Sequence, residues 1–324
     1  MSARFLVLWL AAVLAAACGR GDRPDRVRIG VMPKLVGIDY FNACERGARE
    51  AGEELGVEVV YDGPITNDVT RQAEMIDTWI AQRFDAIAVA PNDPHALAPT
   101  LRRAAERGIA VLTWDADSEV DSRRCFVNQA TYEDIGYALV DILARQTGGA
   151  GQVAIITGSL TAANQNIWME WMTRRLASQY PAMQVVAVKP SEEDQQLAFQ
   201  VSQDLLKAYP DLAGIFAITS VALPGAAEAL RQSGAAGQVA LTGLATPNSM
   251  RQYVKDGTVQ SVLLWNPVDL GYLTVQAAAR LVRDGALPPE LAAGRLGPIR
   301  VRDGEVLLGP PLEFSRGNID DFDF

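Results

Sequence analysis

The sequence is poor in the residues that most metal and catalytic sites require. It contains one histidine, His95, and three cysteines among 324 residues. A single histidine nearly excludes a histidine-based metal site or a Ser-His-Asp triad. The sequence also lacks a nucleophile elbow, a P-loop and an HExxH motif. We therefore expect no metal, no cofactor and no catalytic residues. If the protein were an enzyme, its catalytic groups would have to be an acid/base pair of carboxylates. The candidates are Asp39, Glu45, Asp93, Asp115 and Asp117.

Positive charge is also sparse and is nowhere concentrated. The formal net charge is −10, and lysine and arginine form no dense cluster. Nucleic-acid binding requires clustered cations that neutralise phosphates, so we expect no nucleic-acid partner. Apolar residues make up 49% of the chain. That composition and the chain length fit two lobes of roughly 120–150 residues, each with its own core.

Long apolar runs are missing apart from one near the start. The stretch Phe5–Ala17 is too short to span a bilayer but fits the core of a signal peptide. The small residues before Cys18 resemble a bacterial lipobox, in which the cysteine is acylated, although Ala15 stands where that motif favours leucine. We expect residues 1–18 to be a lipoprotein signal ending at a lipidated cysteine, and residues 19–26 to be a tether. An ordinary signal peptide is the alternative. Lipidation implies an exported protein anchored at the periplasmic face of a bacterial membrane.

From Val27 onward, short apolar strands alternate with helices of ten or more residues, and the alternation restarts after Asn128. This pattern indicates parallel sheets that are covered by helices on both faces. The sequence therefore predicts an α/β fold of two doubly wound parallel-sheet lobes joined by a hinge of crossover strands. We place the N-terminal lobe at 27–126 plus 249–295 and the C-terminal lobe at 127–248 plus 296–324. The crossovers are expected near Cys125–Asn128, Thr246–Asn248, Leu264–Asn266 and Gly294–Ile299.

Two cysteines lie within the predicted lobes, Cys44 in a helix and Cys125 in a strand. An exported compartment permits a disulfide between them, but nothing in the sequence shows that they meet. We favour two buried free thiols.

Polar and aromatic side chains follow the predicted strands. In open α/β sheets a ligand binds beyond the carboxyl ends of the strands, so these side chains are expected to share one cleft. Amides and charged groups suit the hydroxyls of a sugar-like ligand, and aromatic rings suit its weakly apolar faces. The candidates are Lys34, Tyr40, Phe41, Asn92, Trp114, Asp115, Asn164, Gln165, Trp168, Trp265 and Asn266.

Each candidate also has a structural interpretation. Lys34 is compatible with a solvated surface lysine, Asp115 with a turn cap and Asn164 with a helix N-cap. Trp114 and Trp265 are compatible with plain core residues. We favour the ligand interpretation because all of them fall at the carboxyl ends of strands.

Several of these segments resemble one known family. They are Ile29-Gly-Val-Met-Pro-Lys-Leu-Val-Gly37, Tyr61-Asp-Gly-Pro64, Val111-Leu-Thr-Trp-Asp-Ala-Asp117, Asn164-Gln-Asn-Ile-Trp168, Ala222-Leu-Pro224 and Ala245-Thr-Pro-Asn248. The chain is similar to the type I periplasmic sugar-binding proteins of ABC importers, in particular the branch of the autoinducer-2 receptor of the Lsr importer and the rhamnose-binding proteins. The resemblance runs from about Val27 to the tail. It implies two lobes that close around a sugar-like ligand.

The resemblance also implies which residues bind. Binding residues of the autoinducer-2 receptor are matched by Lys34, Asp115 and Gln165. The chain differs from the family at four further positions. Asn164 stands where the family has aspartate, Ile218 where it has proline, Ser220 where it has alanine and Asn266 where it has aspartate. The changes exchange anionic acceptors for amides and add a hydroxyl. We therefore expect a pentose or a deoxyhexose such as rhamnose as ligand, with autoinducer-2 as the alternative.

The resemblance implies partners as well. We expect a monomer that binds a small polar sugar-like ligand, docks on the membrane subunits of an ABC importer and is held at the membrane by its lipid anchor. LacI-type regulators share this core but carry a helix-turn-helix of about 60 residues before it. Because the core starts at Val27, directly after a signal segment, we do not expect that role. A chemosensory role would differ from transport only in the partner.

Overall fold

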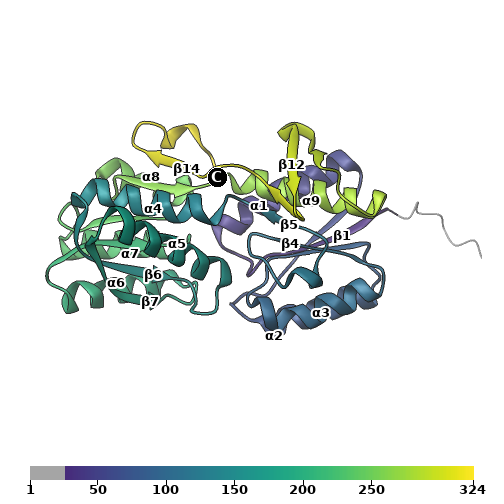
Figure 1. The fold of residues 1–324 in the computed structure, drawn as a ribbon, viewed down its shortest axis with the longest axis horizontal. Helices are drawn as coiled ribbons and strands as arrows, with labels where there is room; N and C mark the ends of the chain where they lie inside the picture. The colour runs from purple at the N-terminus through teal and green to yellow at the C-terminus, as the bar shows by residue number, and fades with distance from the viewer. Residues whose placement is uncertain (1–25) are drawn as a thin grey trace, which may run out of the picture.

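The computed structural model describes residues 26–324. The expected signal segment, Cys18 and all but the last residue of the expected tether lie outside the described residues. Within the described part, no helix is long and apolar enough to cross a membrane. Figure 1 shows two lobes lying side by side along the long axis of the molecule.

The first lobe is built on a mixed sheet. Strands β2, β1, β3, β4 and β5 are parallel neighbours, and β13 adds to β5 in parallel before β12 and β11 continue antiparallel. Their bounds are β1 Arg28–Met32, β2 Glu58–Tyr61, β3 Ala86–Val89, β4 Ala110–Trp114, β5 Phe126–Asn128, β11 Glu290–Ala292, β12 Pro298–Arg302 and β13 Glu305–Leu307.

Helices cover both faces of this sheet. Side chains alternate across the strands, so Val31 of β1 belongs to one core cluster and its neighbour Met32 to another. The helices on the Val31 side are α1 (Asp39–Leu55) and α9 (Pro267–Asp284), and those on the Met32 side are α2 (Val69–Ala81) and α3 (Pro94–Glu106).

The second lobe has a parallel four-stranded sheet in the order β7-β6-β8-β9, beside an antiparallel pair of β10 and β14. A single bridge between Leu244 and Leu263 links β10 to the end of β9. The strands are β6 Ala150–Thr157, β7 Ala182–Pro190, β8 Leu212–Ala217, β9 Ala240–Gly243, β10 Ser261–Leu264 and β14 Leu312–Ser315. The helices are α4 Tyr132–Thr147, α5 Ala163–Gln179, α6 Gln195–Ala208, α7 Ala222–Ser233 and α8 Pro247–Asp256, with short 3-10 turns η1 Val120–Ser122, η2 Gly294–Leu296 and η3 Ile319–Asp321 elsewhere in the chain.

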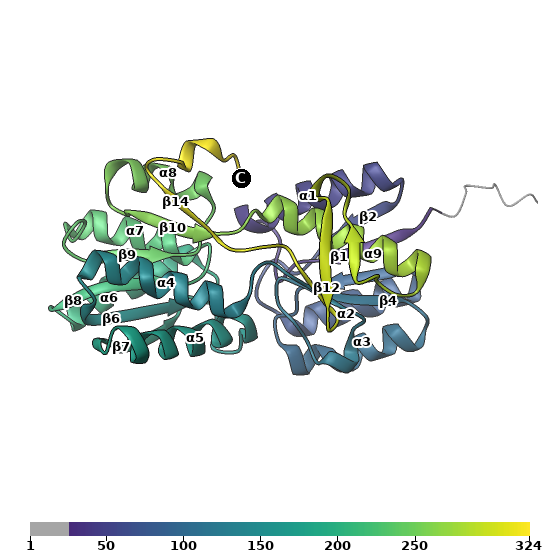
Figure 2. The ribbon, with the colours of Figure 1, turned by 45° about the horizontal axis from the view of Figure 1, so that its top comes forward.

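The strand pairing places several elements of the C-terminal third in a different lobe from the one expected. Helix α8 and strand β10, expected in the first lobe, pack in the second, whereas β12 and β13, expected in the second, extend the first sheet. The chain crosses between lobes after β5, between β10 and α9, and between β13 and β14, the last visible as the yellow segment in Figure 2. The predicted crossovers at Thr246–Asn248 and Gly294–Ile299 are therefore wrong. The first segment lies within the second lobe, and the second lies within the first lobe.

Two local features follow from the sequence. Helix α4 begins after Thr131, which caps it by accepting from the Asp134 backbone N–H. Cys44 and Cys125 are both buried and free, as favoured from the sequence.

Helices α1 and α9 pack with their backbones in contact. A Cβ on Gly47 would overlap the carbonyl oxygen of Val268, and one on Gly271 would overlap that of Cys44. Neither glycine has a positive φ, so its role here is to permit close approach. This contact fixes α9, and with it the strand-to-helix junction at Trp265, against the first residues of α1.

We expect Gly47→Ala to destabilise the protein. The added methyl forces the two helices apart, which typically costs about 1–3 kcal/mol of overpacking, against a gain of at most about 1 kcal/mol in helix propensity. Urea denaturation measures the net loss in the free energy of unfolding. Gly309→Ala is the control, because its Cβ would meet nothing within 4 Å. Equal stability of the two variants would contradict the close packing.

Candidate ligand-binding site between the lobes

A cavity lies where the carboxyl ends of both parallel sheets face each other. It takes residues from the loops after β1, β4, β7, β8 and β9, from the end of β10 and the residue after it, and from the first two turns of α1 and α5. Its lining comprises Lys34, Ile38, Tyr40, Phe41, Asp115, Asn164, Gln165, Trp168, Glu193, Ile218, Thr219, Ser220, Leu244, Leu264 and Trp265.

Most of the residues selected from the sequence meet at this cavity. Those that line it are Lys34, Tyr40, Phe41, Asp115, Asn164, Gln165, Ile218, Ser220 and Trp265. The strand-end rule therefore selected residues that the fold brings together at one cavity.

Three selected residues do not line the cavity. Asn266 is the N-cap of α9, where its side-chain oxygen accepts from the Val268 backbone N–H at 2.9 Å. Trp114 is fully buried in the first core and donates its indole N–H to the Met32 carbonyl at 3.2 Å. Asn92 supports the site from behind, because its side chain donates to the Lys34 carbonyl at 2.9 Å.

Asp115 presents its carboxylate from an unusual backbone position. Its φ is +62°, a left-handed conformation that aspartate tolerates better than most residues. Tyr40 donates to its Oδ1 at 2.6 Å, and Trp265 in turn donates its indole N–H to the Tyr40 hydroxyl at 2.8 Å. Burial raises the pKa of Asp115, while the charge of Lys34 and the Tyr40 hydrogen bond oppose that rise.

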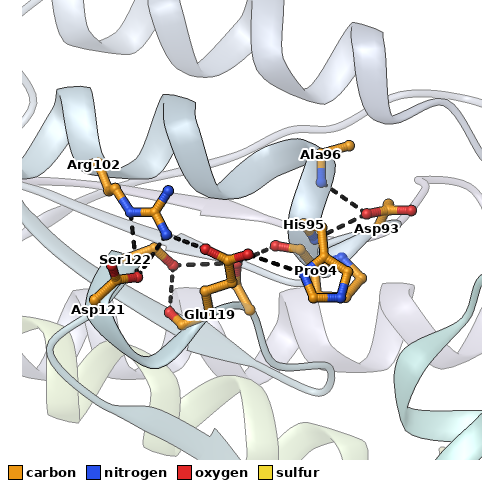
Figure 3. Close-up of polar contacts among 9 residues, drawn as sticks. Asp93, Pro94, His95, Ala96, Arg102, Glu119, Asp121 and Ser122 are labelled. Atoms are coloured by element: carbon orange, nitrogen blue, oxygen red, sulfur yellow. Dashed lines mark hydrogen bonds and ion pairs between the residues drawn. The ribbon is translucent and has the colours of Figure 1, made fainter.

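The loop that follows Asp115 is fixed by polar contacts at the surface (Figure 3). The carboxylate of Glu119 lies between His95, whose Nδ1 is 2.9 Å away, and Arg102, which also reaches Asp121 at 2.7 Å. These bonds tie the loop to α3. His95 has a side chain that is 80% exposed, so the only histidine of the chain contributes to a surface network. The part of the chain that the structure describes holds no cluster of histidine, cysteine and acidic residues that suits a metal ion.

Lys34 connects the two lobes. Its side chain is buried, and its ammonium group donates to Oδ1 of Asn164 in α5 at 2.9 Å. The Asn164 amide nitrogen is 3.4 Å from the backbone carbonyl of Asp115, also in the first lobe. Asn164 is therefore not the N-cap of α5, a position held by Ala162, but a contact across the cleft.

Gln165 has its amide orientation fixed. Its side-chain oxygen accepts from the Thr157 hydroxyl at 2.5 Å and from the Gly158 backbone N–H at 2.6 Å. The amide nitrogen must then point away from β6, and it donates to Oε1 of Glu193 at 3.0 Å. The side chain is thus a rigid donor at the cavity wall.

One cavity residue outside every segment selected from the sequence is Glu193. Glu193 follows β7 in the stretch Ser191–Asp194. The same strand-end rule reaches this stretch when it is applied to β7, so the signal was present in the sequence. Trp168, which was among the strand-end aromatics, also lines the cavity.

Comparison with known proteins identifies the family to which the chain belongs. A family model described as "periplasmic binding protein domain" matches residues 29–286. The chain belongs to the periplasmic binding protein family. The resemblance to the type I sugar-binding branch and the predicted fold class are both confirmed.

Individual relatives resemble the chain over most of its length. The D-ribose/D-allose-binding protein of Pseudomonas aeruginosa is 26% identical over 273 residues, which is 77% of this chain and 83% of the relative. LsrB of Clostridium saccharobutylicum, solved in complex with AI-2, superposes with a TM-score of 0.89 at 28% identity, covering 92% of this chain and 100% of LsrB. A solute-binding protein of Clostridium phytofermentas with bound L-rhamnose gives 0.87 at 31% identity, covering 91% and 98%. These relatives are binding proteins, and this periplasmic binding protein is not an enzyme.

The raised pKa of Asp115 predicts a pH-dependent stability. A carboxyl group whose pKa is higher in the folded than in the unfolded protein holds its proton more tightly when folded. Its contribution to the free energy of unfolding therefore falls as pH rises from 3.8, the unperturbed value, through the folded pKa. Asp115→Asn removes this titration and keeps a residue that tolerates the left-handed φ.

We expect the free energy of unfolding of the native protein, minus that of Asp115→Asn, to decrease between about pH 4 and pH 7. Urea titrations of both proteins across this range measure the difference. A difference that grows with pH would contradict the raised pKa. It would mean that Lys34 and Tyr40 lower the pKa of Asp115 by more than burial raises it.

Proposed function

We propose that this protein is the solute-binding lipoprotein of an ABC importer and that it captures a small sugar or sugar-like polyol, such as a pentose or a deoxyhexose like rhamnose. Its relatives are sugar-binding periplasmic proteins of ABC transporters. The observation that carries the proposal is the cavity itself, because both lobes contribute fixed donors and acceptors to one small space. Neither lobe alone provides all the donors and acceptors that line the cavity.

The chemistry of the lining suits hydroxyl groups. A carboxylate accepts two or more hydroxyl hydrogen bonds, and an ammonium group donates to hydroxyl oxygens. Asp115 and Lys34 supply these two groups from the first lobe, and Gln165 supplies an oriented amide from the second. The aromatic rings of Phe41, Trp168 and Trp265 provide flat apolar surface for a sugar ring.

Binding is coupled to lobe closure in this proposal. The bond between Lys34 and Asn164 requires the lobes to touch. A ligand that contacts both walls favours this arrangement over an open one, so it shifts the population toward closure. The closed form would then be the one that docks on the importer's membrane subunits.

The N-terminal part of the proposal is an anchor at the membrane. The lipobox-like stretch before Cys18 supports acylation and retention at the periplasmic face of a bacterial membrane. Fractionation of cells that express the native chain or Cys18→Ala tests this. The anchor is rejected if both chains partition equally between membrane and soluble fractions.

A second candidate ligand is autoinducer-2. It is favoured by the LsrB likeness and by the three binding positions at which the chain retains the residues of that receptor, Lys34, Asp115 and Gln165. The replacement of an aspartate by Asn164 weakens this candidate, because an anionic acceptor for a ligand hydroxyl is lost at that position.

Titration calorimetry with L-rhamnose, D-ribose, D-allose, D-arabinose and autoinducer-2 distinguishes the candidates. We expect micromolar or tighter binding of at least one sugar and weaker binding of autoinducer-2. Micromolar binding of autoinducer-2 together with no response to any sugar would sink the sugar assignment in favour of the second candidate.

The lysine that joins the lobes provides a sharper test. Lys34→Ala removes a charge-assisted hydrogen bond of about 1.5–3 kcal/mol, so affinity for the sugar bound best by the native protein should fall at least about tenfold. Lys207→Ala is the control, since Lys207 is an exposed lysine on α6. Equal affinity in both variants would show that Lys34 does not contact the ligand.

A further inference from the structure

Glu193 occupies a strained segment of the second lobe. Both Glu192 and Glu193 have positive φ values, +51° and +54°, at the turn between β7 and α6. Two consecutive non-glycine residues in the left-handed region are costly, and such strain tends to occur at functional sites. The result of this turn is that the Glu193 side chain reaches the cavity, which it helps to line.

The Glu193 carboxylate is held in place from two sides. Oε1 accepts from the Gln165 amide at 3.0 Å, and Oε2 accepts from the Thr219 hydroxyl. Space for it depends on Gly158, because a Cβ at that position would overlap Oε1. Each carboxylate oxygen has a second lone pair, so the group retains capacity to accept further hydrogen bonds.

Trp168, whose side chain lines the same cavity, carries an unpaired donor. The indole nitrogen of Trp168 is buried and has no hydrogen-bond partner, and the side chain as a whole is 3% exposed. Buried polar groups are nearly always paired. Because the indole N–H can only donate, the missing partner must be an acceptor such as a hydroxyl oxygen.

The charges around the cavity disfavour an anionic ligand. Burial is the main cause of the raised pKa of Asp115, and the negative charge of Glu193 adds to it. The Lys34 ammonium group lines the same space and offsets one of them. A ligand whose hydroxyls donate to both carboxylates and accept from Trp168 and Lys34 satisfies every group without adding a charge.

We propose that Glu193 is a ligand-binding carboxylate, that the indole N–H of Trp168 is a second ligand-binding group, and that the two select a neutral polyol with a hydroxyl directed at the second lobe. This inference rests on the proposed function and deepens it. Glu193 supplies from the loop after β7 the anionic acceptor that Asn164 does not supply from α5.

Titration calorimetry of Glu193→Gln against L-rhamnose, D-ribose, D-allose and D-arabinose tests the assignment. Glutamine keeps the shape and removes the charge, so affinity for the sugar that the native protein binds best should fall at least about tenfold. Gly158→Ala should cause a similar loss, because it displaces the same carboxylate. Glu192→Gln is the matched control, because Glu192 also has a positive φ but does not line the cavity. The affinity of this variant for the same sugar should stay within about twofold of the native value.

The outcomes separate this inference from the proposed function. Native protein that binds a sugar, with Glu193→Gln binding it equally well, overturns the role of Glu193 and leaves the proposed function intact. Native protein that binds none of the four sugars overturns both. Thermal denaturation of the unliganded variants verifies that a loss of affinity is not a loss of fold.

Discussion

The central physical constraint on this protein is that Lys34, a charged side chain, is buried at the junction of two lobes. A buried ammonium group must be paired, or its desolvation would be prohibitive. Its hydrogen bond goes to Asn164 of the opposite lobe, and its charge opposes the rise in the pKa of Asp115. The pairing of one lysine therefore depends on lobe contact, and the same groups are those that a polar ligand would use. In the proposed function, the stability of the closed arrangement and ligand recognition are therefore linked through this one residue.

The surrounding structure serves to hold the polar groups still. Asp115 and Glu193 both take left-handed backbone positions, one in each lobe. Tyr40, Trp265 and the surface network around Glu119 constrain the first, while Gln165 and Thr219 constrain the second. Rigid presentation reduces the entropy that binding must overcome. The close packing of α1 against α9 extends this rigidity to the junction at Trp265.

Sequence reasoning reached the fold class and most of the cavity because both follow from local rules. Short apolar strands that alternate with helices specify a parallel sheet, and the carboxyl ends of such strands specify where a ligand lies. What it could not supply was side-chain direction: Trp114 and Asn266 follow the same rule as Asp115 and Trp265, yet one points into the core and the other caps a helix. Lobe membership of β10, β12 and β13 also escaped it, because a short strand joins whichever sheet edge is open, and that is settled by contacts far apart in the sequence.

Small-angle X-ray scattering of the purified protein, with and without a saturating sugar from the calorimetry panel, tests whether one ligand joins the two lobes. If the ligand completes the contacts between Lys34, Asp115 and the second lobe, the radius of gyration should fall on binding, and Lys34→Ala should show a smaller fall at saturation. An unchanged scattering profile with bound sugar would contradict the claim that one ligand joins the two lobes.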